Sequence, residues 1–151
     1  MANEPPTSAH TTPLATVLAW HDAANRKDCP GAAELCATDI LMNGPQGELR
    51  GLHVMRDWVC RSGKWLVPAR TWTSGSRVAV EQEIARPDTP DTDPGPHGPH
   101  RAGAVFEVIG GRITACARYS DVSEALAAAG IADGTPPDAT EARSTPRPAR
   151  P

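Results

Sequence analysis

The side chains that could carry out chemistry are spread thinly along this chain. His97 and His100 have a spacing that metal ions can use, but they lie in a proline- and glycine-rich segment without a third ligand nearby in sequence. His21 is expected to be a core histidine with a local hydrogen bond, and His53 is expected to lie on the surface. The histidine pattern therefore predicts neither a metal site nor a cofactor.

The cysteines give no recognisable site. Cys29, Cys36, Cys60 and Cys116 are too few and too widely spaced for a zinc site or a disulfide scaffold. Free cysteines are commonly buried and behave as small apolar residues. We therefore predict four reduced, mostly buried thiols.

Charge and hydropathy exclude two classes of partner. The formal net charge is −3 and the basic residues are scattered, so the basic surface needed to bind nucleic acid is absent. No segment approaches the roughly 20 consecutive apolar residues of a membrane span, and the N-terminus has no basic region followed by an apolar one. The sequence predicts a soluble, cytoplasmic protein without a nucleic-acid or membrane partner.

Proline marks the expected domain boundaries. Of the 16 prolines, eight lie in residues 1–13 and 132–151, and five lie between Pro87 and Pro99. Such segments have too little apolar surface to offset the entropy lost on ordering. We predict a single folded domain at 12–131 with a Pro/Gly-rich loop at 87–101, and disordered tails at 1–11 and 132–151.

The segment from Ala102 to Ile131 predicts two strands, their turn and a closing helix. Apolar residues alternate before Gly110-Gly111, which suits a tight hairpin turn, and a second run follows from Arg112 to Ser120. Asp121 stands at the N-cap position of the next helix, and Gly130 can end that helix.

The preceding residues predict three helices and three strands. The helices begin after Thr12, after Asp28 and at Leu52, where caps and proline-containing first turns precede a 3.6-residue apolar period. The strands are expected at Ile40–Met42, Trp65–Thr73 and Arg77–Arg86. This order predicts an α+β domain in which a curved antiparallel sheet wraps around three N-terminal helices and a short C-terminal helix follows.

A family resemblance emerges at this point. The runs VAVEQEI, AGAVFEVIGGRITACARYSD and ALAAAGI resemble the SnoaL-like branch of the nuclear transport factor 2-like superfamily, and the likeness covers Leu14 to Ile131. The resemblance implies a cone whose hollow interior holds an apolar ligand. Members include polyketide cyclases, steroid isomerases, epoxide hydrolases and proteins of no known activity, and they are usually homodimers. Fold membership by itself does not assign a reaction.

The residues at the family's catalytic positions depart from each known mechanism. Arg118 occupies the position of the acid/base aspartate of the cyclases and epoxide hydrolases. Asn43 replaces the proton-abstracting carboxylate of the steroid isomerases and agrees only with the asparagine that holds water in epoxide hydrolases. An asparagine cannot act as a general base.

Four further positions complete this picture. Gln82 and Ile84 stand where the epoxide hydrolases have arginine and aspartate. The tyrosine of the steroid isomerases maps near Trp20, and a histidine or aspartate of the neighbouring strand maps to Ala104. None of the three mechanisms is intact.

The remaining pocket candidates favour an apolar ligand with a negative charge. Arg118 and Asn43 are the catalytic candidates, because together they could stabilise negative charge as an oxyanion hole does. An unpaired buried guanidinium requires an anionic partner. The predicted substrate-binding residues are Trp20, Trp58, Val80, Gln82, Ile84, Phe106 and Cys116.

The facing of Arg118 depends on the hairpin register. With a two-residue turn at Gly110-Gly111, Arg118 pairs with Gly103 and faces outward. With a three-residue loop and a bulge, the register moves by one and Arg118 joins the face of Ala104. The resemblance favours the inward register, whereas alternation within the second strand favours the outward one.

Two functions follow from these expectations. The chain could bind a small, largely apolar, anionic biosynthetic intermediate in the cone and catalyse its cyclisation, isomerisation or hydrolysis. Alternatively, it could be a noncatalytic ligand-binding or accessory module that has lost the acid/base residues. Glu81 and Glu83 are expected on the outer face, toward solvent or a partner copy, so a homodimer is predicted.

Overall fold

The computed structural model describes residues 12–44, 47–61, 65–85 and 100–138. His97 and the side chain of His100 lie outside the described residues, as does most of the predicted loop 87–101. Within these ranges no cluster of three or more His, Cys, Asp or Glu side chains could hold a metal ion. No helix in the described part of the chain is long and apolar enough to span a membrane.

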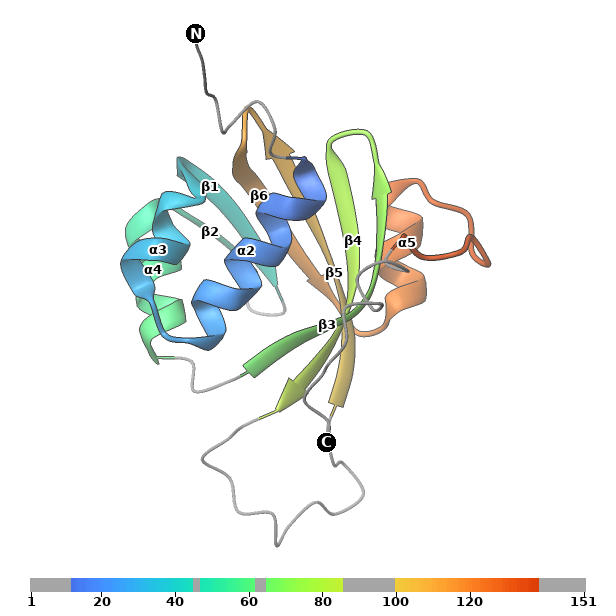
Figure 1. Ribbon diagram of the computed structural model, residues 1–151, viewed down its shortest axis with the longest axis horizontal. Coiled ribbons are helices and arrows are strands. Elements are labelled where there is room, and N and C mark those ends of the chain that lie inside the picture. The colour runs from blue at the N-terminus through green and yellow to red at the C-terminus, as the bar shows by residue number, and fades with distance from the viewer. Residues whose placement is uncertain (1–11, 45–46, 62–64, 86–99, 139–151) are drawn as a thin grey trace, which may run out of the picture.

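The architecture is α+β, as predicted. Figure 1 shows the N-terminal helices on one side of a sheet and the C-terminal helix, α5, on the other. The helices are α2 (Pro13–Asn25), α3 (Cys29–Glu34), α4 (Leu52–Arg61) and α5 (Val122–Ala129). The strands are β1 (Cys36–Gly44), β2 (Gly47–Arg50), β3 (Trp65–Ser74), β4 (Arg77–Ala85), β5 (His100–Ile109) and β6 (Arg112–Tyr119).

The sheet is mixed, which corrects the prediction of an antiparallel sheet. Its six strands are ordered β2-β1-β6-β5-β4-β3, and β1 runs parallel to β6. The predicted strand Ile40–Met42 is longer, because Cys36 already pairs with Ile113 of β6. The segment predicted as a connection contains β2, which pairs antiparallel with β1. The pattern of apolar residues cannot reveal a pairing between strands so far apart in sequence.

The helix ends agree well with their sequence signals. The Thr12 side chain accepts a hydrogen bond from the backbone N–H of Ala15, and Pro13 begins α2. Asp28 caps α3 in the same way, accepting from Gly31 N–H. That helix ends at Glu34, since the backbone from Cys36 onward is taken up by strand pairing.

Two apolar cores lie on the two faces of the sheet. The larger core fills the space between α2, α3, α4 and the sheet, and its fully buried members include Val17, Ile40 and Phe106. The smaller core lies under α5, where Leu126 and Ala129 pack with Trp72 and Ala79. The outer face of the sheet is therefore partly covered by the chain's own helix.

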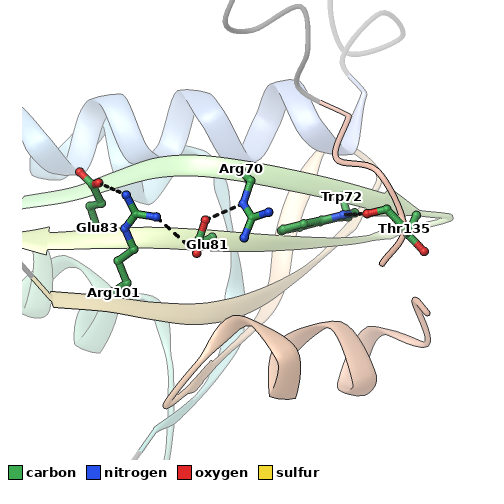
Figure 2. Close-up of polar contacts among 6 residues, drawn as sticks. All are labelled: Arg70, Trp72, Glu81, Glu83, Arg101 and Thr135. Atoms are coloured by element: carbon green, nitrogen blue, oxygen red, sulfur yellow. Dashed lines mark hydrogen bonds and ion pairs between the residues drawn. The ribbon is translucent and has the colours of Figure 1, made fainter. Parts of the chain in front are cut away.

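Glu81 corrects the expectation for the paired glutamates. Glu83 is partly exposed, but only 7% of Glu81 is exposed. Glu81 Oε1 accepts from Arg70 Nε at 2.7 Å, and Arg101 Nη1 lies 3.6 Å from Oε2. Figure 2 shows these side chains in a row across β3, β4 and β5. The outer face therefore contains a buried carboxylate held by two arginines.

The cysteines also differ from the prediction. Cys29, at the start of α3, forms a disulfide with Cys60, in the last turn of α4, with a Cα–Cα separation of 5.9 Å. Cys36 and Cys116 are free, as predicted. The packing of α3 against α4 brings together two residues 31 positions apart, and spacing alone could not indicate that contact.

The chain continues beyond α5 along β3. The Trp72 indole N–H donates to the Thr135 carbonyl at 2.7 Å (Figure 2), and the Asp138 backbone N–H donates to the Thr71 carbonyl at 2.7 Å. The Asp138 carboxylate also accepts from the Thr73 hydroxyl. Residues 132–138, predicted to belong to a disordered tail, thus make specific contacts with the sheet.

Candidate ligand-binding cavity

A cavity of about 590 Å³ lies between the N-terminal helices and the concave face of the sheet. Its lining is mostly apolar, with polar side chains at a small number of points. The lining residues are Trp20, Met42, Asn43, Gly44, Gly47, Leu49, Met55, Trp58, Leu66, Gln82, Ala102, Ala104, Phe106, Cys116, Arg118, Tyr119, Ser120 and Glu124.

A bulge in β6 turns Arg118 toward this cavity. Ile109 pairs with Arg112 across the two-residue turn, but Glu107 pairs with Ala115, so Thr114 is an extra residue in β6. Arg118 consequently pairs with Ala104. The inward register is therefore the one observed, although the bulge lies within β6 rather than in the loop.

Arg118 has no counter-ion in the described part of the chain. Arg118 is half-buried in the cavity wall, and no carboxylate of the described residues forms an ion pair with its guanidinium. Glu124, another lining residue, instead accepts a hydrogen bond from the Ser120 hydroxyl at 2.9 Å. Within the part of the chain that the structure describes, the cavity thus presents one uncompensated cation.

Aromatic rings form one wall. Trp20 stacks on Trp58 with ring centroids 6.4 Å apart and an interplanar angle of 20°. Phe106 lies against Trp20 with a centroid distance of 5.5 Å. Trp20 and Phe106 are almost fully buried, whereas Trp58 is partly exposed, so it can contact both a ligand and solvent.

His21 lies behind this wall and holds Gln82. Its Nδ1 lies 2.8 Å from the Val17 carbonyl oxygen, and its Nε2 lies 2.9 Å from Gln82 Nε2. Burial lowers the pKa of His21 from 6.5 to about 4, opposed in part by the hydrogen bond to Val17. The imidazole is neutral at pH 7, and the prediction of a core histidine is confirmed.

Two buried polar atoms of the lining residues have no partner. Trp20 Nε1 and Gln82 Oε1 form no hydrogen bond with any described residue, although the residues are only 2% and 1% exposed. One atom is a donor and the other an acceptor. Unpartnered buried polar groups are rare in native proteins, and a ligand or ordered water is a common explanation.

The thiol of Cys116 is protonated at physiological pH. Burial raises the pKa of its thiol to about 12, despite the opposing effect of the Arg118 charge. Burial likewise raises the pKa of Cys36 to about 12. Both side chains are therefore neutral thiols at physiological pH and neither supplies a thiolate nucleophile.

The structure brings together most of the predicted site. Trp20, Asn43, Trp58, Gln82, Phe106, Cys116 and Arg118 all line the cavity. Val80 and Ile84 share the inner face but lie in the apolar core and do not line the cavity. Met42, Leu49 and Met55 were not anticipated, since helix α4 and the β1–β2 pairing position them.

Asn43 does not reach the position predicted for it. Met42 pairs with Cys116 on the cavity face of β6, so the alternation of the strand assigns Asn43 to the opposite face, level with Ala117. Asn43 is exposed, although it is one of the residues that line the cavity. The register therefore gives no support to an oxyanion hole formed by Asn43 with Arg118.

Sequence comparison identifies the family of this cavity-containing fold. The model of the SnoaL-like domain matches residues 17–116, which is more than half of the chain. The chain belongs to the SnoaL-like domain family. Within this SnoaL-like domain, the match includes the aromatic wall, Gln82 and the bulge of β6. No curated protein is similar enough in sequence to count as a match.

Solved structures share the fold of this SnoaL-like domain. An NTF2-like protein of unknown function from Cytophaga hutchinsonii is 19% identical, covers 75% of this chain and 93% of its own, and has a TM-score of 0.62. A proposed polyketide cyclase from Sinorhizobium meliloti is 17% identical, with coverages of 68% and 92% and a TM-score of 0.59.

A third solved structure contains a small molecule. The protein from Catenulispora acidiphila has a ketosteroid isomerase-like fold and was crystallised with trimethylamine. It is 20% identical, covers 81% of this chain and 96% of its own, and has a TM-score of 0.56. At these levels of identity the similarities establish the fold only. The ligand of this SnoaL-like domain has to be inferred from its own residues.

Proposed function

We propose that the cavity binds a small, largely apolar molecule that carries an anionic group. The observation that carries this proposal is Arg118, a half-buried cation in the cavity wall without a counter-ion among the described residues. A buried guanidinium is costly unless it is paired, so a ligand carboxylate or enolate is its natural partner.

The rest of the lining supports the apolar part of the ligand. A volume of about 590 Å³ is suited to a molecule of two or three fused rings. Trp20, Trp58 and Phe106 offer flat aromatic surfaces on the same wall. Stacking against these rings would hold a planar ligand while its charged end faces Arg118.

Catalysis is the second candidate function. The proposed polyketide cyclase and the ketosteroid isomerase-like protein share the fold, and Arg118 could stabilise a negative charge that develops during cyclisation, isomerisation or hydrolysis. Among the described lining residues, however, no histidine is present. The one carboxylate there, Glu124, accepts a hydrogen bond from the Ser120 hydroxyl. We therefore place binding before proton-transfer catalysis.

A binding titration tests the proposal. Naphthoic acid is added to the protein and followed by tryptophan fluorescence and by thermal shift, since Trp20 and Trp58 line the cavity. We expect saturable quenching and a raised Tm, both much weaker at the same ligand concentration in Arg118→Ala. Arg112→Ala is the matched control, because Arg112 is an exposed arginine of the same strand.

Two outcomes contradict the proposal. One is the absence of binding by any apolar acid, and the other is equal binding by the wild type and Arg118→Ala. Trimethylamine, which is a cation when protonated, is a useful comparison because Arg118 should disfavour it. Conversion of a bound ligand to product would support catalysis. A homodimer and a cytoplasmic location remain predictions, to be tested by light scattering and by fractionation.

A further inference from the structure

We propose that Gln82 is a specificity-determining residue that accepts a hydrogen bond from a ligand hydroxyl, with its carboxamide oriented by Val17 and His21. The inference rests on the proposed function and deepens it. It predicts a ligand that carries a hydroxyl or N–H donor at the Gln82 end of the cavity in addition to the anionic group at Arg118.

The orientation begins at the backbone of α2. A carbonyl oxygen can only accept a hydrogen bond, so the 2.8 Å contact with Val17 requires the proton of His21 on Nδ1. In a neutral imidazole the other nitrogen, Nε2, then has no proton and must accept. The helix therefore selects the tautomer of His21.

The tautomer in turn orients the amide. Since His21 Nε2 accepts, the group of Gln82 that lies 2.9 Å away must be the –NH₂ donor and not the oxygen. The oxygen, Oε1, has no partner among the described residues, at a residue that is 1% exposed and lines the cavity. Rotation of the amide would bring two acceptors together and break the bond to His21.

The same wall provides a donor. Trp20 Nε1 is buried and has no partner among the described residues, and the Trp20 ring contacts His21 edge-on at 5.2 Å. Two lining residues of the cavity thus carry one acceptor and one donor that have no partner among the described residues, both deeply buried beside the aromatic rings. A ligand hydroxyl can satisfy both kinds of group because it donates and accepts.

The sheet register sets the spacing between the two ends of the ligand. Arg118 lies level with Ala104 and Val80, whereas Gln82 lies two residues farther along β4. Two strand spacings across and two residues along give roughly 12 Å between the backbone positions of Gln82 and Arg118. Both residues line the cavity, so the ligand class is a hydroxylated aromatic acid with its hydroxyl remote from the carboxylate.

The experiment compares naphthoic acid, a derivative with the hydroxyl on the ring remote from the carboxylate, and the methyl ether of that derivative. Dissociation constants are measured by calorimetry on the full-length protein. A satisfied buried hydrogen bond should make the hydroxy acid bind about 10-fold or more tightly than the other two acids. The methyl ether controls for size, because it lacks the donor.

Variants locate the origin of the preference. Gln82→Met keeps the length of the side chain without an acceptor. The ratio of the dissociation constants of naphthoic acid and the hydroxy acid should therefore fall to about 1, while naphthoic acid still binds. His21→Phe should also reduce the preference, because the amide is then free to rotate. Arg118→Ala should weaken all three acids together and leave the preference in place.

The possible failures are distinguishable. If none of the acids binds to the wild type, the proposed function is wrong and this inference falls with it. If the acids bind equally, or if the preference for the hydroxy acid survives in Gln82→Met, the assignment of Gln82 is wrong while anion binding stands. If His21→Phe does not fold, the Gln82→Met result alone decides.

Discussion

Arg70 of β3 and Glu81 of β4 form a hydrogen-bonded ion pair of 2.7 Å on the face of the sheet away from the cavity. Arg70 also lies over the Trp72 ring, with its guanidinium carbon 5.2 Å from the ring centroid. Glu83 binds the neighbouring Arg101 at 2.7 Å but is partly exposed. The two glutamates differ in burial although they are only two residues apart.

Replacement of these glutamates should therefore have unequal effects. Glu81→Gln removes a buried charge that pairs with two arginines, and we expect it to lower the free energy of unfolding by about 1–3 kcal/mol. Glu83→Gln is the matched control, with an expected loss below about 1 kcal/mol. Urea unfolding of both variants makes the comparison. Equal losses would contradict the role given to Glu81.

The pH dependence of stability should reveal His21. Its pKa is about 4 in the folded state and near 6.5 when unfolded, so the unfolded chain takes up a proton first as the pH falls. The contribution of His21 to the free energy of unfolding should be fully present above pH 6.5. It should decline toward pH 4, by up to roughly 3 kcal/mol. The Arg70 hydrogen bond lowers the pKa of Glu81, so that contribution is lost only at lower pH, below the usual 4.5.

Variants separate the two contributions to this profile. Unfolding is measured at a series of pH values in the wild type, in His21→Phe and in His53→Gln, where His53 is an exposed histidine. His21→Phe should flatten the decline between pH 6.5 and 4, and His53→Gln should retain it. A decline that persists in His21→Phe would assign the effect to other groups.

Gly103 permits the close approach of α5 to β5. A Cβ at this position would lie 2.5 Å from the Asp121 carbonyl oxygen and 2.7 Å from the Ala125 Cβ. Gly103→Ala should therefore displace α5 and destabilise the protein by about 1–3 kcal/mol. Gly44→Ala is the control, since a Cβ there would meet no atom of the described residues within 4 Å. Similar midpoints of thermal unfolding in both variants would contradict this reading of the packing.

The Cys29–Cys60 disulfide should stabilise the helical layer. It closes a loop across 31 positions, for which loop entropy predicts about 3–4 kcal/mol. We expect a reductant to lower the Tm of the wild type and to leave the double variant Cys29→Ser, Cys60→Ser unchanged. Thiol titration in denaturant shows directly whether the disulfide is present. Two thiols react when it is present, and four react when it is absent. Four thiols before reduction would show that the bond is absent.

Local signals in the sequence determined most of the elements, though not β2, and several of their ends. Thr12, Asp28 and Asp121 stand at helix caps in the structure, and Gly110-Gly111 forms the turn between β5 and β6. These features depend on residues within four positions of one another, so a single chain carries the whole signal. The inner face of β4 and β5 follows equally from alternation.

The tertiary structure decided the features that depend on distant residues. Three such features join segments that no local pattern connects. They are the parallel pairing of β1 with β6, the disulfide, and the ion pairs of Glu81 with arginines of β3 and β5. The facing of Arg118 is the clearest example. One extra residue, Thr114, shifts the register by one, and because side chains alternate with a period of two, that single shift turns Arg118 from the outer face into the cavity.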